Sequence, residues 1–281
     1  MPGAFPFPHR PPRGRWPGIR ETLPALMCTV TVRREGGGLL LTMNRDERMD
    51  RAAEEPPRRI PGEVDRPSWI APFDGATGGT WVGVNDRGVA ACILNGYGPL
   101  DGGLRGRPGV PSRGSIIPRI LEDQDGSGPV ALREAIDFSA YPSFTLLVVA
   151  PRGGEIVRWS HGEGISREAV PEGWSVLTSS SWDEPHVARF RRAAFASWLE
   201  EGARDVEGIP LVHLRVPPGT ERESPFMTRE DSATRSITQV RVAFASGEAS
   251  LSWWPRSGRA VVDPHRPGAT LTLPLAATAS R

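Results

Sequence analysis

The sequence predicts an α+β fold in which antiparallel sheets are stacked in layers and covered by helices. Three pairs of β-type segments are each joined by a short turn that contains glycine, which is typical of β-hairpins. A long segment over residues 184–201 carries apolar side chains at helical spacing. Consecutive hairpins imply antiparallel sheets, whose apolar faces must be covered. This order of elements favours a layered sandwich over a doubly wound parallel sheet.

The expected strands are short and rich in β-branched residues. The first pair surrounds the glycines at 36–38, the second surrounds Asn85–Gly88, and the third surrounds Arg152–Gly154. One strand then precedes the long helix, and two strands follow it. In chain order the expected strands are Cys28–Arg33, Leu39–Met43, Gly79–Val84, Val89–Leu94, Phe144–Ala150, Glu155–Ser160, Trp174–Thr178, Ile237–Ala245 and Ala249–Trp254.

Helices are expected at three places. The segments Ser115–Glu122 and Pro129–Phe138 have helical character, and a proline suits the first position of a helix. The strongest helix is Glu184–Glu201, which Asp183 is expected to cap. Because these helices alternate with hairpins, they are expected to cover the sheets.

The remaining segments are expected to be loops or an extension. Residues 1–27 are rich in Pro, Gly and Arg and cannot bury much apolar surface, so they are interpreted as a disordered extension, a propeptide or a wrongly assigned start. Residues 28–281 are expected to form a single domain. Within it, Asp46–Thr77 and Gly98–Gly114 are predicted to be loops because of their proline or glycine content.

Composition and charge exclude several classes of function. Of the 281 residues, 38% are hydrophobic and 24% are charged, as in globular proteins. All 34 basic residues are arginine, and they are interspersed with 33 acidic residues, so we expect no binding site for nucleic acid and none for a membrane. Without lysine the chain can form neither a lysine Schiff base nor a P-loop.

The histidines, the cysteines and the hydropathy lead to further expectations. The five histidines and two cysteines are too scattered for a zinc motif, so neither a metal nor another cofactor is expected. No apolar run approaches the roughly 20 residues of a membrane span, and residues 1–26 lack the apolar region of a signal peptide. A cytoplasmic protein that acts on a small molecule is therefore expected, and its oligomeric state is left open.

The first hairpin is expected to gather reactive side chains. If its turn centres on Gly36 and Gly37, position 28 lies opposite position 45. The residues Asn44–Glu47 then lie beside Cys28. A thiol, a guanidinium group and two carboxylates would converge there.

This cluster has two interpretations. If Cys28 becomes the first residue, its α-amino group, with a pKa of about 7.7–8.0, can take the thiol proton. Arg45 would then favour the thiolate, so the pKa of Cys28 is expected below about 8.5 and Arg45 is expected to serve the thiolate rather than the core. In the structural alternative, a cysteine in a strand is a small apolar residue and a charged turn is solvated. Cys92, in the middle of an expected strand, is assigned to the core.

The same residues resemble a known family. Met27–Val32 followed by Thr42–Glu47 is similar to the opening of the NRDE family, which is named after the tetrapeptide and includes the transport and Golgi organisation proteins. Gly78–Asn85 resembles the next block of that family, and Arg229–Thr238 resembles a later one.

The family is in turn similar to the N-terminal nucleophile (Ntn) hydrolases, which include bile-salt hydrolases and penicillin V acylases. That resemblance implies a four-layer α-β-β-α sandwich with Cys28 as the nucleophile, Arg45 as its catalytic partner, and Asp46 or Glu47 as the accompanying carboxylate. It also implies Asn95 as a donor to the oxyanion and Arg189 as a second arginine of the active site.

Four further residues are candidates for substrate binding: Asn44, Glu47, Trp81 and Ser179. Ser179 stands where the resemblance leads us to expect asparagine. Losing one oxyanion donor can cost about 10²–10³ in rate, so this position bears directly on activity.

The resulting hypothesis is an amide hydrolase that cleaves the C–N bond of an N-acyl small molecule through an N-terminal cysteine. The rival hypothesis is a non-catalytic protein on the same fold that binds or carries haem or acyl lipids, which resemblance to eukaryotic members of the family implies.

Overall fold

The computed structural model describes residues 27–63, 65–98, 101, 104, 107–123, 136–181 and 184–276. Within these ranges two large sheets face each other, and neighbouring strands of both run antiparallel. The α+β class predicted from the hairpins is therefore confirmed.

The first large sheet has six strands in the order β10-β1-β2-β13-β14-β15. These are β1 (Met27–Glu35), β2 (Gly38–Arg48), β10 (Gly173–Ser180), β13 (Ser232–Ala243), β14 (Glu248–Pro255) and β15 (Ala269–Pro274). The strands β1 and β2 form the first predicted hairpin. Because side chains alternate along a strand, each strand sends one row toward the second sheet and the other row to the opposite face.

The second large sheet has seven strands in the order β3-β4-β5-β6-β7-β8-β9. These are β3 (Glu54–Ile60), β4 (Trp69–Asp74), β5 (Val82–Asn85), β6 (Ala90–Asn95), β7 (Phe144–Ala150), β8 (Gly153–Ser160) and β9 (Gly164–Ala169). A separate short ribbon pairs β11 (Asp205–Val206) with β12 (Ile209–Pro210).

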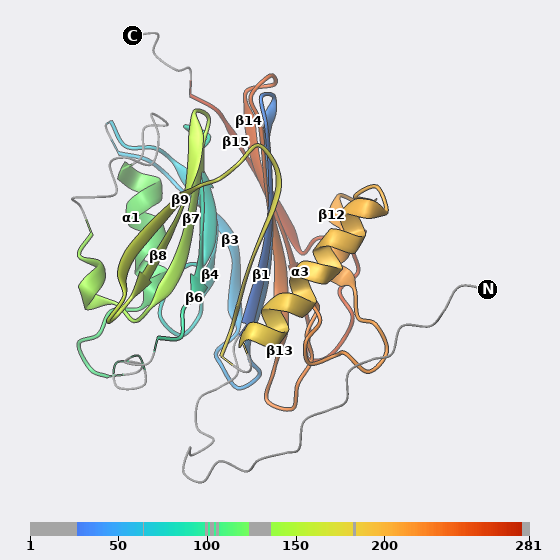
Figure 1. Cartoon of the computed structure of the whole chain (residues 1–281). Coiled ribbons are helices and arrows are strands. Elements are labelled where there is room, and N and C mark those ends of the chain that lie inside the picture. Colours follow the sequence, from blue (N-terminus) through green and yellow to red (C-terminus); the bar gives the residue numbers. More distant parts are fainter. Residues whose placement is uncertain are drawn as a thin grey trace.

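The two longest described helices cover the outer faces of the sheets (Figure 1). Helix α1 (Ile116–Asp123) lies against the second sheet, where the carbonyl of Leu121 accepts a hydrogen bond from Asn85 at 2.9 Å. Helix α3 (Glu184–Glu200) lies on the far side of the first sheet. One apolar core joins the two sheets and includes Val30 and Met43 of the first and Ile93 of the second. The order of layers is therefore helix, sheet, sheet, helix.

The segment 46–77 differs from the prediction of a loop, because it contains the end of β2 and the strands β3 and β4. Pro56 and Pro57 make β3 hard to predict from the sequence, because proline has no N–H to donate to a β-ladder. The register between β3 and β4 shifts between Glu55 and Arg58, where these prolines lie, and β3 is an edge strand. The strands β9 and β15 and the β11–β12 ribbon were not predicted either.

Two of the three expected helices are present. Helices α1 and α3 agree with the predicted segments to within about a residue at each end. Most of the third, Pro129–Phe138, lies outside the described residues, as does the expected cap Asp183. The last residue of that segment, Phe138, begins a 3₁₀ turn, η4 (Phe138–Ala140).

Candidate active site

Cys28 near the start of β1 pairs with Arg45 of β2, in the register that the hairpin predicts. On its other side Cys28 pairs with Ser179 of β10. Directly paired residues point to the same face of a sheet. Arg45 contacts Glu54 and Asp74 of the second sheet, so this row of side chains lies between the two sheets.

The tetrapeptide Asn44–Glu47 divides between the two faces of β2. Arg45 and Glu47 point toward the second sheet, where they contact each other at 3.3 Å. Asn44 and Asp46 point the other way. Asn44 donates to the carbonyl oxygens of His213 and Pro225 at 2.9 and 2.7 Å. Asn44 is therefore held inside the protein on the face away from Cys28 and does not line the pocket beside it.

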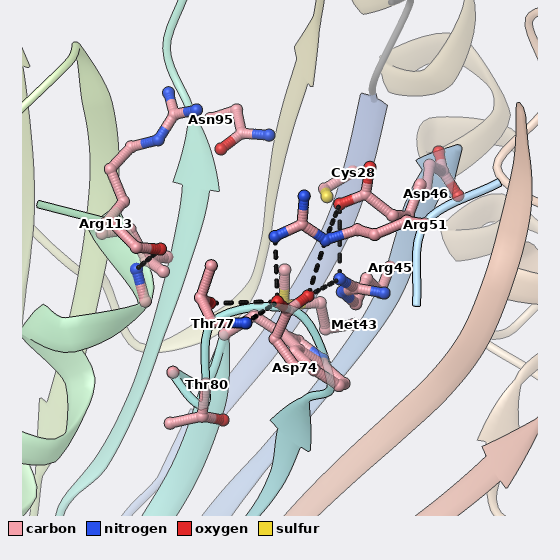
Figure 2. Close-up of a pocket in the computed structure, with 16 residues that line it drawn as sticks. Cys28, Met43, Arg45, Asp46, Arg51, Asp74, Thr77, Thr80, Asn95 and Arg113 are labelled. Carbon is pink, nitrogen blue, oxygen red and sulfur yellow. Dashed lines mark hydrogen bonds and ion pairs between the residues drawn. The ribbon is translucent and has the colours of Figure 1, made fainter. Parts of the chain in front are cut away.

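A pocket of about 140 Å³ opens beside Cys28, and its wall includes Arg45, Glu47, Trp81 and Asn95. Figure 2 shows Asn95 beside Arg113, and Arg51 between Cys28 and Asp74. Asn95 is only partly buried at the end of β6. The pocket therefore brings Cys28 together with the amide group of Asn95. It also contains Arg51 and Arg113, two arginines that the sequence did not suggest.

The close approach of Gly79 and Gly114 forms part of the pocket wall. A Cβ atom on Gly79 would lie 2.8 Å from the carbonyl carbon of Gly114, so a side chain there would force the two segments apart. The N–H of Thr80 donates to the carbonyl of Gly114 at 3.0 Å. This contact brings the 3₁₀ turn η2 (Arg113–Ser115), and with it Arg113, to the pocket.

Arg45 is the centre of a buried ion network. Its guanidinium donates to Asp74 at 2.6 Å, to Glu54 at 2.7 Å and to Glu47 at 3.3 Å. Its centre also lies 4.4 Å from the centroid of the Trp81 ring. Only 6% of Arg45 is exposed. Because three carboxylates surround this cation, it has a structural role that the sequence-based interpretation did not give it.

Asp46 forms a second network on the opposite face of the sheet. Its carboxylate accepts from Arg191 of α3 at 3.2 Å and from the hydroxyl of Thr234 at 2.6 Å. Burial raises the pKa of Asp46 to about 6, and the Arg191 guanidinium opposes that rise. Asp46 is thus mainly ionised at neutral pH; it is one of the residues that line the pocket, while its carboxylate is paired with Arg191.

The Cys28 thiol is 6% exposed at the residue level and is strongly shielded from water. Burial raises the pKa of Cys28 to about 12, and the negative charge of Asp46 adds to the rise. A hydrogen bond from the backbone N–H of Asp46 and the charge of Arg45 oppose it. The pKa of Cys28 is therefore raised while Met27 precedes it, and the lowered pKa, which was expected for a chain that begins at Cys28, stays a prediction. Burial also raises the pKa of Cys92, which lies in the core as expected.

Several buried donors around Cys28 have no hydrogen-bond partner among the described residues, and two of them bear on the candidate site. These are the indole N–H of Trp81, which lines the pocket, and the hydroxyl of Ser179, which pairs with Cys28 in the ladder but is not among the lining residues. Leaving such a donor unpaired costs roughly 1–3 kcal/mol, so a bound acceptor would recover that free energy. The arrangement can therefore supply hydrogen bonds to a negatively charged oxygen.

The arginine of α3 that reaches the site region is not the predicted one. Arg189 is exposed on the outer face of α3. Arg191 is fully buried and shares a face with Val187, Phe195 and Trp198. Arg189 does not line the pocket beside Cys28, so the structure does not bring it to the candidate site. The helical spacing of these buried residues was the signal that could have identified Arg191.

The family model described as "Transport and Golgi organisation 2" matches residues 27–217. The chain belongs to this family. In this member of the Transport and Golgi organisation 2 family, the tetrapeptide that the sequence resemblance rests on is buried at all four positions.

Several solved structures resemble the chain at low sequence identity. An N-acylethanolamine-hydrolyzing acid amidase ortholog from Caenorhabditis elegans is 14% identical, with a TM-score of 0.49, over 75% of this chain and 92% of that one. A mutant conjugated bile acid hydrolase from Clostridium perfringens is 12% identical, with a TM-score of 0.43, over 88% and 96%. Penicillin V acylase from Agrobacterium tumefaciens is 12% identical, with a TM-score of 0.40, over 82% and 86%.

No curated protein sequence matches the chain significantly. No helix within the described ranges combines the length and the apolar content of a membrane span. In the same part of the chain, no group of three or more His, Cys, Asp or Glu residues is arranged to hold a metal ion.

Proposed function

We propose that this protein hydrolyses a linear amide bond of an N-acyl small molecule, with Cys28 as an N-terminal nucleophile. The observation that carries the proposal is the position of Cys28 in the wall of a pocket, between the guanidinium of Arg45 and the unpartnered hydroxyl of Ser179. A nucleophile, a nearby cation and a free donor are the groups that acyl transfer requires.

In the proposed reaction the α-amino group of Cys28 is the base. It takes the thiol proton, and the sulfur forms a bond to the acyl carbon. The resulting oxyanion accepts hydrogen bonds from the Ser179 hydroxyl and from Asn95. Its collapse breaks the C–N bond, and the leaving amine takes the proton from the α-ammonium group. Water, deprotonated by the same amine, then cleaves the thioester, releases a carboxylic acid and restores the thiol.

The requirement for a free amine follows from the burial of Cys28. Burial raises the pKa of Cys28 to about 12, so the thiol stays protonated at neutral pH while Met27 is attached. An adjacent α-amino group has a pKa of about 7.7–8.0 and removes the need for a free thiolate at equilibrium. We therefore propose that removal of the residues before Cys28 activates the protein.

The proposed substrate is small and polar at the reacting end. The pocket wall carries charged and hydrogen-bonding groups, among them Arg51, Asp74 and Arg113. No cofactor or metal takes part in the proposed reaction, and the proposed location is the cytoplasm.

The test uses protein whose first residue is Cys28, mixed with a panel of N-acyl amides. We expect a burst of released amine that approaches one equivalent per protein, followed by steady turnover, and an acyl adduct on the Cys28 peptide by mass spectrometry. Cys28→Ser should lose the thioester adduct, whereas Cys92→Ser should keep it. Absence of both amine release and adduct across the panel would overturn the proposal.

One observation favours a binding protein as the second candidate. The charge of Arg45 is already neutralised by Glu47, Glu54 and Asp74, so it assists a thiolate less than an unpaired cation would. Saturable binding of an acyl lipid or of haem, with no acyl release, would support this candidate instead.

A further inference from the structure

We propose that Arg191 is a positioning residue for Cys28, which it holds in place from the opposite face of the sheet. The effect of Arg191 on turnover rests on the function proposed above. Its effect on the geometry of β1 and β2 follows from the hydrogen bonds of its side chain alone. Arg191 lies on α3, far along the chain from Cys28, and does not line the pocket.

The side chain of Arg191 is held by hydrogen bonds to several segments of the chain, and this set of contacts is called the Arg191 clamp below. Its side chain has no exposed surface. One terminal nitrogen donates to the hydroxyl of Thr29 at 2.7 Å, and the other donates to Asp46 at 3.2 Å. The same guanidinium donates to the carbonyl oxygens of Glu223 and Ser224 at 2.9 and 2.8 Å. A planar guanidinium with all these bonds is fixed in position and orientation.

The two side chains held by Arg191 lie next to the two residues of the site. Thr29 follows Cys28 on β1, and Asp46 follows Arg45 on β2. Because β1 and β2 run antiparallel, Thr29 and Asp46 lie on opposite sides of the Cys28–Arg45 pair, so Arg191 joins the two strands diagonally across that pair. The clamp therefore acts on the backbone of both strands at the position where the thiol emerges on the other face.

The backbone of Asp46 carries this restraint to the sulfur. Its N–H forms the hydrogen bond that partly offsets the raised pKa of Cys28. The carboxylate of Asp46 is held by Arg191 and by Thr234 of β13, so the peptide unit that bears this N–H is fixed from both sides. If Asp46 lost its hydrogen bond from Arg191, the backbone N–H of Asp46 would be less firmly held next to the Cys28 sulfur. A displacement of a catalytic group by about 1 Å can lower the rate about a hundredfold.

The test compares Arg191→Gln with Arg192→Gln, its exposed neighbour on the same helix. Hydrogen–deuterium exchange is measured at the amide of Asp46 and at Val240 of the same sheet. In Arg191→Gln we expect exchange at Asp46 to rise about tenfold or more while Val240 stays protected, and we expect kcat to fall by a similar factor with little change in KM. Arg192→Gln should behave as wild type in each measurement.

Unchanged exchange at Asp46, or an equal rise at Asp46 and Val240, would overturn the positioning role. If Arg191→Gln does not fold, Thr29→Val tests the same clamp, because it removes one acceptor and keeps the shape of the side chain. Thr29→Val should also raise exchange at Asp46 selectively, and an unchanged rate there would contradict the proposal. If wild-type protein hydrolyses no amide, the proposed function fails, and the exchange measurement still decides the role of Arg191.

Discussion

Ser179 lies directly opposite Cys28 in the ladder between β10 and β1, and its buried hydroxyl has no hydrogen-bond partner among the described residues. A buried hydroxyl without a partner reduces the stability of a fold. In the proposed mechanism the Ser179 hydroxyl gains a hydrogen-bond partner when the oxyanion forms. The unpaired hydroxyl therefore lowers the stability of the resting protein but stabilises the transition state of the reaction.

Ser179→Ala is therefore expected to lower kcat by about 10²–10³ without lowering the thermal midpoint. Removal of an unpaired polar atom from the interior is neutral or slightly stabilising, which separates this change from ordinary damage to the core. Steady-state kinetics and thermal unfolding are measured together. Ser166→Ala, on the exposed side of β9, is the control and should change neither quantity. A Ser179→Ala enzyme with unchanged kcat would remove Ser179 from the site.

Arg45→Ala is expected to lower the free energy of unfolding by about 3–5 kcal/mol, because it leaves an excess of buried carboxylate charge. For a chain of this size the midpoint should fall by about 10 °C. The sequence alone led to the expectation that Arg45 serves the thiolate rather than the core, whereas its three buried carboxylate partners predict a loss of stability. Arg33→Ala is the matched control, since that arginine pairs with Glu35 at the surface and should change stability by less than about 0.5 kcal/mol. Equal midpoints for both variants would show that the network around Arg45 does not stabilise the fold.

The hairpin register could be predicted because the length of the turn fixes which residues oppose each other. Cys28 opposite Arg45 followed from the glycines at 36 and 37 alone. The same alternation of side chains also separates Asn44 and Asp46 from Arg45 and Glu47, a consequence that the sequence interpretation did not draw. Local geometry thus gave the neighbours of Cys28 correctly but did not say to which face of the sheet each side chain points.

The rest of the site comes from segments that local patterns could not place. Glu54 and Asp74 lie on β3 and β4, and the prolines of β3 made this region resemble a loop. Arg191 occupies a buried position among apolar residues of α3, where helical periodicity predicts core rather than a charged contact. Contacts between distant segments, such as those of Arg191 with Thr29 and Asp46, depend on how the layers stack.

His213 should make stability fall in acid. It is fully buried, with Nδ1 donating to the Asn44 oxygen at 2.6 Å and Nε2 accepting from the Thr31 hydroxyl at 2.7 Å. The Asn44 amide nitrogen donates to two carbonyls, which leaves its oxygen to accept and fixes this neutral form. Burial lowers the pKa of His213 to about 3. The unfolded chain binds a proton at this histidine near pH 6.5, so its contribution to stability is present above pH 6.5 and is lost as pH falls toward 3.

The measurement is the difference in unfolding free energy between wild type and His213→Asn at several pH values. That difference should shrink by about 1.4 kcal/mol for each pH unit below 6.5. The comparison cancels the opposite contribution of Asp46, whose raised pKa makes the folded state less stable as pH rises through about 6. His265→Asn, at an exposed position, should show no such trend. A difference that does not vary with pH would mean that His213 is not held neutral.

The central claim is that Cys28 becomes a nucleophile only when its own amino group is free. Two proteins that differ only in the presence of Met27 test it most directly, with intact mass confirming the first residue of each. On addition of an N-acyl amide that the active form turns over, the chain that begins at Cys28 should form a thioester on Cys28 and release amine. The chain that keeps Met27 should do neither, because burial holds the pKa of its thiol near 12. Equal acylation and equal amine release by the two chains would contradict the account.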